Sequence, residues 1–181
     1  NTSFTVEGIV IDQGLPGDDD DSGRVISNSV SVTANETDSD TSNNTDDIDI
    51  TVSKFQLYKE VRNVTAGGAF TTSVTGKPGD VLEYRINYTR TGPPIFDVIL
   101  EDTLDANVSL GQNTYGASTD KEISLRCPDG TDVLLETGAV TTINIDLVAE
   151  CTLNTATDAT STVREALLNS EAGYFLFKVR I

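Results

Sequence analysis

The chain has 181 residues with 29 acidic and 12 basic side chains, which gives a net charge of −17 at pH 7. Nucleic-acid binding depends on basic side chains that neutralise phosphates, so this charge excludes that class of protein. The chain contains no histidine, which excludes serine triads, imidazole general bases and typical zinc sites. No apolar run approaches the roughly 20 residues that cross a bilayer, so we expect a soluble chain without membrane insertion.

The first 50 residues form a distinct acidic block, with 12 acidic side chains and one basic residue, Arg24. Hard cations prefer clustered carboxylates, so one acidic run is a weak candidate for Ca²⁺: Asp18, Asp19, Asp20 and Asp21. The run lacks the D-x-D-x-D-G spacing of a preformed calcium loop. We therefore expect a solvated turn and no cofactor.

Apolar and polar residues alternate twice in the later part of this block. Val30 and Val32 alternate with serines and a threonine, and Ile48 and Ile50 alternate with aspartates and a threonine. A period of two residues is typical of strands with one buried face. The block is therefore predicted to contain two half-buried strands.

The same period recurs after residue 53, in segments separated by turn sequences. The segments lie around residues 55–61, 82–88, 96–100, 143–147 and 175–181. The turn sequences include GKPGD, TGPP and CPDG, and no segment has a helical period longer than two turns. Many short strands with such turns predict an all-β, antiparallel β-sandwich.

The only two cysteines, Cys127 and Cys151, lie 24 residues apart and outside any C-x-x-C pair. We predict a disulfide between them, which contributes about 3 kcal/mol in the chain-entropy model. Disulfides persist in oxidising compartments, so this pair indicates an extracellular, secreted or cell-surface protein. Candidate glycosylation sites are the asparagines of the six N-x-S/T tripeptides, namely Asn1, Asn35, Asn43, Asn63, Asn87 and Asn107.

The sequence GDVLEYRINYTRTGPPIFDVILEDTLD, residues 79–105, resembles the conserved repeat of bacterial and archaeal surface proteins. That repeat is catalogued as a domain of unknown function and is built as an immunoglobulin-like β-sandwich. Its pattern GDxxxYxIxxxNxG is matched except at Arg90, where the family favours asparagine, and Asp105 stands where the family favours proline. KFQLYKEV (54–61) resembles the first strand of the repeat, and EALLNSEAGYFLFKVRI (165–181) resembles a late strand.

The order of these motifs is shifted relative to the family. Its closing elements resemble NSVSVTANETDSDTSNNTDDIDITV, residues 28–52, which here precedes the first strand. The resemblance therefore implies two parts: an acidic N-terminal extension with donor strands, residues 1–52, and an incomplete immunoglobulin-like β-sandwich, residues 53–181. The extension contains closing strands without a sandwich, and the sandwich lacks its closing strands.

Almost no linker separates residues 52 and 54, so we expect the extension to complete the sandwich of a neighbouring identical copy. The chain is then a structural, pilus-like subunit of an extracellular surface filament, assembled head-to-tail by β-strand complementation. The predicted donor-strand residues are Phe4, Val6, Ile26, Val30, Val32, Ile48 and Ile50. The predicted acceptor residues are Phe55, Leu57, Phe175, Phe177 and Val179.

The chain lacks methionine, so we expect a processed subunit or an excerpt of a covalent tandem array. The alternative function is a carbohydrate- or receptor-binding adhesin module, in which the loop of residues 111–120, with Tyr115, carries recognition. We assign no catalytic residue and do not expect an enzyme.

Lys59 shares the side of its strand with Phe55, Leu57 and Val61, which is unusual for an ammonium group. The interpretation we favour is a lysine that extends to solvent at the sheet margin. In some surface sandwiches such a lysine forms an isopeptide bond with an asparagine, assisted by an acid. Here the alternative would join Lys59 to Asn28 with the help of Asp102.

Overall fold

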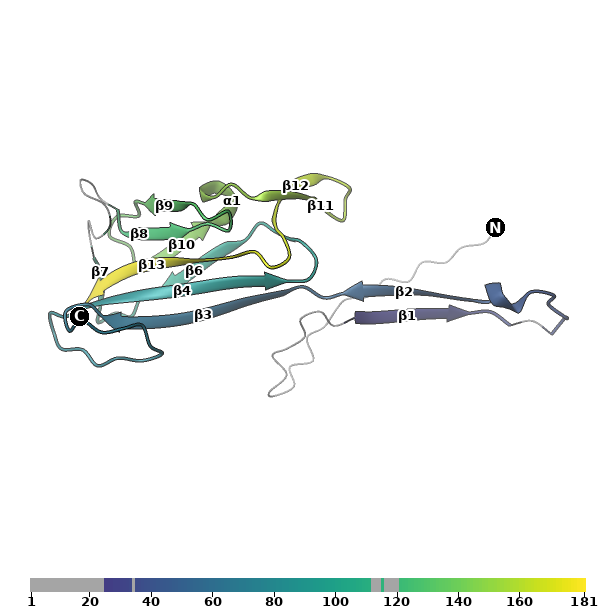
Figure 1. Cartoon of the computed structure of the whole chain (residues 1–181), viewed down its shortest axis with the longest axis horizontal. Coiled ribbons are helices and arrows are strands. Elements are labelled where there is room, and N and C mark those ends of the chain that lie inside the picture. The colour runs from purple at the N-terminus through teal and green to yellow at the C-terminus, as the bar shows by residue number, and fades with distance from the viewer. Residues whose placement is uncertain (1–24, 34, 112–114, 116–120) are drawn as a thin grey trace.

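The computed structural model describes residues 25–33, 35–111, 115 and 121–181, and within them the protein is all-β (Figure 1). Helix is confined to a 3-10 turn, η1 (Thr41–Asn43), and one α-helical turn, α1 (Leu147–Glu150). Asp146 caps α1 by accepting hydrogen bonds from the backbone amides of Val148 and Ala149. The all-β prediction is confirmed.

The first two strands form a hairpin that pairs with no other strand of the described chain. β1 (Val25–Ser31) and β2 (Thr45–Thr51) are antiparallel over their full length. The hairpin extends away from the other strands along the long axis of the molecule (Figure 1). We call residues 25–51 the hairpin and residues 54–181 the body.

The body contains a six-stranded sheet in the order β3-β4-β13-β8-β9, with β7 also paired to β13. Its strands are β3 (Lys54–Asn63), β4 (Val81–Thr91), β7 (Ser109–Leu110), β8 (Ile123–Arg126), β9 (Asp132–Leu135) and β13 (Ala172–Arg180). All of its pairings are antiparallel.

Two smaller antiparallel sheets complete the body. One pairs β6 (Ile99–Thr103) with β10 (Thr142–Asp146), and the other runs in the order β11-β12-β5. The strands of the latter are β5 (Ile95–Phe96), β11 (Asn154–Thr157) and β12 (Val163–Leu167). The separate sheets give the body a β-sandwich-like form.

The core contains alternate residues of these strands. β13 buries Phe175, Phe177 and Val179, while β10 buries Ile143 and Ile145. The alternation predicted from the sequence is therefore what places these side chains inside.

Cys127 and Cys151 are bonded, with their Cα atoms 5.6 Å apart. The predicted disulfide is present. It ties the end of β8 to the residue after α1, and both cysteines belong to the core.

Candidate assembly site

The hairpin has an apolar face that no other part of the described chain covers. In the strand register Ile26 lies opposite Ile50, and Asn28 lies opposite Ile48, so these four side chains share one face. The Ile48 residue is 63% exposed, and Val30 and Ile50 are exposed to about half their extent. Large apolar side chains gathered on one exposed face are typical of a surface that binds a partner.

The other face of the hairpin is polar. The Ser27 hydroxyl donates a hydrogen bond of 2.5 Å to Asp49, its neighbour across the strands, and Ser29 lies opposite Asp47. Residues 25–52 hold six acidic and no basic side chains. The hairpin is thus amphipathic, with one face suited to water and one suited to burial.

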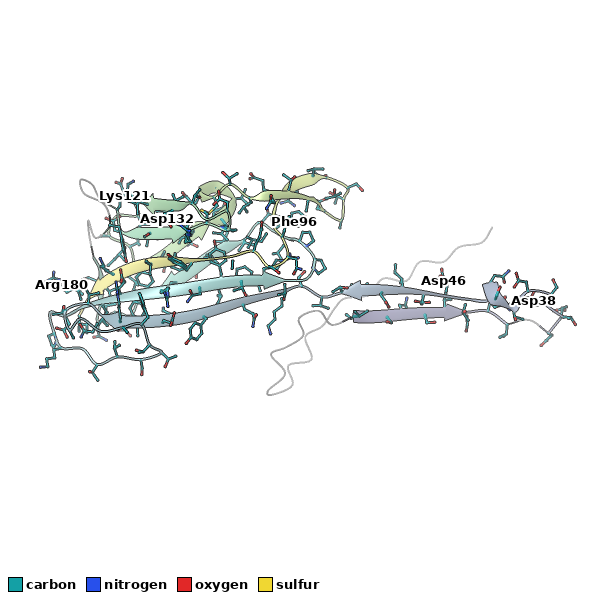
Figure 2. The ribbon with its side chains drawn as sticks, in the orientation of Figure 1. Asp38, Asp46, Phe96, Lys121, Asp132 and Arg180 are labelled. Carbon is teal, nitrogen blue, oxygen red and sulfur yellow. A yellow bond between two sulfur atoms is a disulfide. The ribbon has the colours of Figure 1, made fainter. Side chains whose placement is uncertain are left out.

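The far end of the hairpin is closed by short local hydrogen bonds. Asp40 caps η1 and accepts from the Ser42 amide and hydroxyl, which lowers the pKa of Asp40. The pKa of Asp38 is also lowered, mainly by a hydrogen bond from the Asp40 amide. Figure 2 places Asp38 and Asp46 at this end, well away from the body residues that it labels.

The near end of the hairpin is held against the body. Only Val52 and Ser53 separate β2 from β3, and the Ser53 hydroxyl donates to the Pro93 carbonyl oxygen at 2.7 Å. Gly92 has φ +95°, and a Cβ atom there would lie 2.9 Å from the Val52 carbonyl oxygen. This turn therefore requires glycine, because a side chain there would be strained and would meet the Val52 carbonyl oxygen.

The body has an exposed margin on the inner side of β3. Phe55, Leu57, Lys59 and Val61 form the inward row of this strand, yet Leu57 is 59% exposed and the Lys59 side chain 47%. Val61, further along the same row, is buried. The inward row of β3 therefore lacks cover at Leu57 and Lys59, between the partly buried Phe55 and the buried Val61.

β6 contributes the second side of this margin. Among the described residues β6 pairs with β10 alone, so one of its edges has no strand beside it. Asp102 of β6 accepts from the Lys59 ammonium at 2.5 Å, which links the two sheets at this point. We call Leu57, Lys59 and Asp102 the open margin.

Aromatic rings form the floor beneath Lys59. Its Nζ lies 4.9 Å from the centre of the Tyr84 ring and 5.8 Å from that of Phe177, and the two rings stack on each other. Burial raises the pKa of Tyr84, and the nearby Asp102 raises it further. Asp102 is almost fully buried, with 8% of its side chain exposed. A lysine and an acid thus lie together at an otherwise apolar position.

The prediction that Phe175, Phe177 and Val179 offer an open acceptor edge is wrong. Their strand, β13, pairs with β4 on one side and with β8 and β7 on the other. Both rows of its backbone groups are therefore occupied, and the three side chains are buried. Of the predicted acceptor residues, only Phe55 and Leu57 lie on an edge strand, β3.

Several predicted positions lie outside the described residues. They are Asn1, Phe4, Val6, Asp18, Asp19, Asp20 and Asp21. The calcium hypothesis therefore lies outside the structure, and the part of the chain that the structure describes contains no group of three or more potential metal ligands.

The candidate glycosylation sites differ in their environments. Asn63 is buried, and its Nδ2 donates to Asp80 at 2.9 Å and to the Thr75 carbonyl oxygen at 3.1 Å. A glycan on Nδ2 would displace both bonds, so the folded chain disfavours Asn63 as an acceptor. Asn35, Asn43 and Asn107 are exposed.

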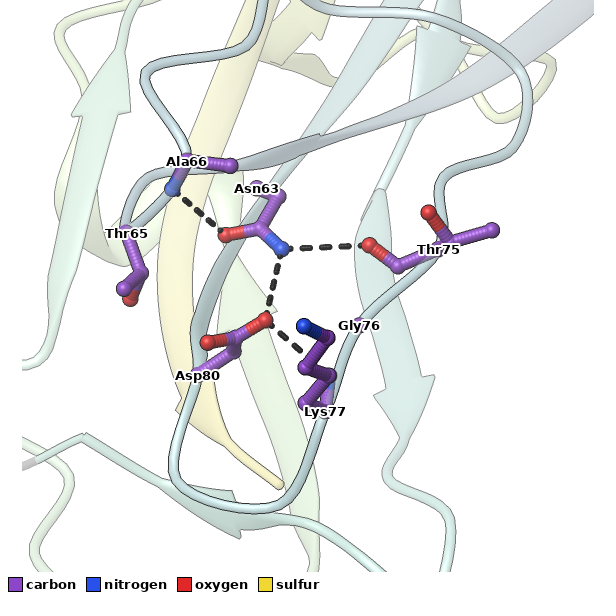
Figure 3. Close-up of a pocket in the computed structure, with 7 residues that line it drawn as sticks. All are labelled: Asn63, Thr65, Ala66, Thr75, Gly76, Lys77 and Asp80. Carbon is purple, nitrogen blue, oxygen red and sulfur yellow. Dashed lines mark hydrogen bonds between the residues drawn. The ribbon is translucent and has the colours of Figure 1, made fainter.

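Asn63 also lines a shallow pocket of about 380 Å³ at the turn between β3 and β4 (Figure 3). Its polar groups are occupied by one another: Asp80 accepts from Asn63 and from the Lys77 amide, and Asn63 accepts from the Ala66 amide. These bonds hold the loop between the strands. The pocket is therefore explained by the structure of the loop itself.

Tyr115, which the adhesin alternative assigned to recognition, is partly buried and donates a hydrogen bond of 2.6 Å to Glu83. Glu83 is buried and also forms an ion pair with Arg62. Burial and the hydrogen bond to Glu83 raise the pKa of Tyr115 well above its usual range. This network had no signal in the sequence, because residue spacing alone does not show that Tyr115 reaches Glu83 of β4.

No protein-family model, curated protein or solved structure matches the chain. The resemblance to the surface-protein repeat therefore stays a prediction. In the described residues no helix is long and apolar enough to cross a membrane.

Proposed function

We propose that the chain is a structural subunit of an extracellular surface filament, assembled head-to-tail by strand complementation. The hairpin of one copy lies on the open margin of the next copy. One observation supports this proposal above all: the same chain carries an uncovered apolar hairpin face and a sandwich-like body with an uncovered inner row.

The geometry at the root of the hairpin favours a neighbouring copy over the chain's own body. The two residues between β2 and β3 span at most about 7 Å when extended. A seven-residue strand is about 23 Å long, so folding back onto β6 would require a much longer connection. The Ser53–Pro93 bond and the close approach at Gly92 also keep the root of the hairpin against the turn at residues 92–93.

In the proposed joint the hairpin adds two strands beside the free edge of β6. Backbone groups of β6 then gain partners, and the apolar face of the hairpin covers Leu57 and Phe55. The result is a complete immunoglobulin-like sandwich made from two copies. Because donor and acceptor are different surfaces of the chain, each joint leaves both ends able to continue, and a filament follows unless the rotation closes a ring.

The chemistry of the joint favours specific assembly. Burying a side chain such as Ile48 or Ile50 contributes about 1.5 to 3 kcal/mol. The acidic outer face of the hairpin stays in water and limits side-by-side aggregation. The disulfide supports an oxidising compartment and hence the proposed extracellular location.

The proposal is tested by measuring particle mass and imaging the particles by electron microscopy. The wild-type chain should form filaments, and Ile48→Asp, which places a charge on the apolar face, should remain monomeric. The matched control is Ser31→Asp, which places the same charge on the polar face opposite the uncharged Thr45 and should still assemble.

A monodisperse wild-type chain that shows no filaments would overturn the proposal and favour the adhesin module. Assembly of Ile48→Asp at the wild-type level would overturn the role of the hairpin.

A further inference from the structure

We infer that the outer face of the six-stranded sheet binds an extended, uncharged polysaccharide, with two of its sugar rings stacked on Tyr58 and Tyr174. The amide of Asn87 lies between the two tyrosines and supplies a hydrogen-bonding group. We call these three residues the tyrosine row. They lie on the opposite face of the sheet from the open margin, so the inference goes beyond the proposed filament and does not depend on it.

The tyrosine row crosses three strands that lie side by side, β3, β4 and β13 (Figure 1). In the strand register Tyr58 of β3 and Tyr174 of β13 both lie opposite Asn87 of β4. The three residues alternate with inward residues such as the buried Tyr88 and Phe175, so they face away from the core. Two strand spacings separate the backbones of the two tyrosines by about 9 to 10 Å.

The side chains of the tyrosine row are accessible. Tyr58 is 53% exposed, and Asn87 and Tyr174 are partly exposed. Nδ2 of Asn87 donates to the Tyr58 carbonyl oxygen at 3.2 Å and to Glu60 at 3.1 Å, which holds the amide in place. Within the described residues no hydrogen bond reaches Oδ1 of Asn87 or the two tyrosine hydroxyls. These oxygens are therefore able to bond to a ligand.

The neighbouring part of the outer face is covered by a loop. The centre of the Phe70 ring, in the loop between β3 and β4, lies 4.7 Å from Cζ of Arg62 and 4.4 Å from Cζ of Arg85. Tyr115 bonds to Glu83 on the same part of the face. These contacts form a border on one side of the tyrosine row and leave the row itself uncovered.

The charges beside the tyrosine row are paired with one another. Glu60 accepts from Arg85 at 2.6 and 2.9 Å. Arg126, which lies opposite Tyr174 on β8, forms an ion pair of 3.0 Å with Asp132. The surroundings of the row are therefore close to neutral, although the whole chain carries a net charge of −17. Such a surface favours an uncharged ligand over a polyanion or a cation.

Aromatic rings and an amide are the groups that recognise neutral sugars. A sugar ring has an apolar face of C–H groups, which packs on an aromatic ring, and hydroxyl groups around its rim, which bond to amide and phenol oxygens. In an extended β-1,4-linked chain every second sugar presents the same face, at a spacing close to that between the two tyrosines. The tyrosine row therefore fits a linear polysaccharide better than a single sugar, which would reach one ring only.

A second copy of this chain is the other candidate occupant of the tyrosine row. Each copy carries a net charge of −17, so two copies that approach through their outer faces repel each other. We therefore assign the row to the polysaccharide, and side-by-side contact between filaments becomes an outcome of the test.

The experiment titrates the full chain with neutral, β-1,4-linked hexasaccharides of glucose, N-acetylglucosamine, mannose or xylose and measures the heat of binding. The chain is produced in a host that does not glycosylate asparagine, so that no attached glycan on Asn87 occupies the row. At least one hexasaccharide should bind. The matching disaccharide should bind about two- to tenfold more weakly, because it reaches one tyrosine. Polygalacturonate, a polyanion, should not bind.

Variants test the residues of the tyrosine row one at a time. Tyr58→Ala and Tyr174→Ala should each weaken binding by about two- to tenfold, whereas Tyr58→Phe, which keeps the ring, should retain most of the affinity. Leu134→Ala is the matched control, because it removes another exposed apolar side chain of the outer face, on β9, and should leave binding unchanged. Ile48→Asp should bind as the wild-type chain does, since the hairpin takes no part.

The outcomes separate this inference from the proposed function. Failure of all four hexasaccharides to bind would overturn the polysaccharide site, whether or not filaments form. Full binding by a chain that carries both Tyr58→Ala and Tyr174→Ala would show a site elsewhere and would also overturn it. Binding of polygalacturonate alone would overturn the assignment to an uncharged ligand. If no saccharide binds and the two substitutions abolish bundling of filaments, the row is a contact between copies instead.

Discussion

The hairpin and the body are built from the same kind of strand, yet they differ in what covers their apolar side chains. Phe177 in β13 is fully buried, whereas Ile48 in β2 is 63% exposed. Ile48 lies between two aspartates, and Phe177 belongs to a row of alternate apolar residues with Phe175 and Val179. Alternation of apolar residues therefore defines a face that can be buried, and the strand topology decides whether the same chain buries that face.

The largest expected effect comes from the same truncation in each region. Phe177→Ala should lower the free energy of unfolding of the subunit by about 3 to 5 kcal/mol, because it leaves a cavity in the core. Ile48→Ala should change it by less than about 0.5 kcal/mol, because that side chain contacts water in the isolated subunit. Denaturant unfolding of monomeric subunits measures both, and equal effects would contradict the distinction between hairpin and body.

The disulfide gives the next largest effect, and it belongs to the body alone. Replacing Cys127 and Cys151 together by serine should destabilise the body by about 3 kcal/mol, because the unfolded chain gains freedom. Denaturant unfolding of the monomeric subunit measures this loss. The hairpin lies outside the loop closed by the bond, so the variant should still join wild-type filaments at a temperature where its body is folded. Failure to join would indicate that the disulfide shapes the acceptor.

The junction between the regions can be altered through Gly92. Gly92→Ala should cost about 1 to 3 kcal/mol, since φ is +95° and the added Cβ would meet the Val52 carbonyl oxygen. Relief of that contact moves the root of the hairpin, so the filament should change its helical repeat or shorten. Gly79→Ala is the control, because φ is also positive there but nothing lies within 4 Å of the added Cβ. Unfolding curves and filament images distinguish the two, and identical filaments would contradict a fixed root.

The smallest effect concerns acid. Asp158 accepts hydrogen bonds from Thr160 and Thr162, which lower its pKa from 3.8 to about 2. A lowered folded-state pKa stabilises the fold above pH 3.8, and this stabilisation is lost as the pH falls toward 2. In Asp158→Asn the free energy of unfolding of the body should therefore fall less steeply between pH 3.8 and pH 2 than in the wild-type chain.

Asp40 provides the matched control in the hairpin, where hydrogen bonds from Ser42 lower its pKa in the same direction. Asp40→Asn should leave the acid unfolding of the body unchanged, because the hairpin makes few contacts with it. Thermal unfolding between pH 2 and 5 measures both variants. A shift with Asp40→Asn equal to that with Asp158→Asn would indicate that hairpin and body unfold as one unit.

Much of the fold could be predicted from residue periodicity. The strands around residues 55–61, 82–88 and 175–181 were expected, because their inward residues are large and alternate cleanly. The sequence analysis did not predict β8 and β9, although it identified the CPDG turn between them. The alternating apolar residues Ile123, Leu125 and Val133 mark these two strands in the sequence. The short strands β7, β11 and β12 have too few residues to establish a period.

The candidate site was only partly predictable. The sequence marked Lys59, because a polar residue in an apolar row is visible in one dimension, and it named Asn28 and Asp102 only in the alternative that was not favoured. It could not reveal that β13 lies between two neighbours, since strand order depends on contacts between residues far apart in the chain. Arg90 was noted as a departure from the resembled repeat, but its full burial, with Nη2 donating to the Gly92 carbonyl, had no signal in the sequence.

The two-residue connection between β2 and β3 has a mechanical consequence. In Figure 1 the hairpin continues the long axis of β3 and β4, so tension on a filament of such subunits would run along the strands. Backbone hydrogen bonds between antiparallel strands lie across that direction, and a pull along the strands loads many of them together. β3 and β4 pair over ten residues, from Lys54 opposite Thr91 to Asn63 opposite Leu82. Each subunit would therefore resist stretching by shear along this pair of strands.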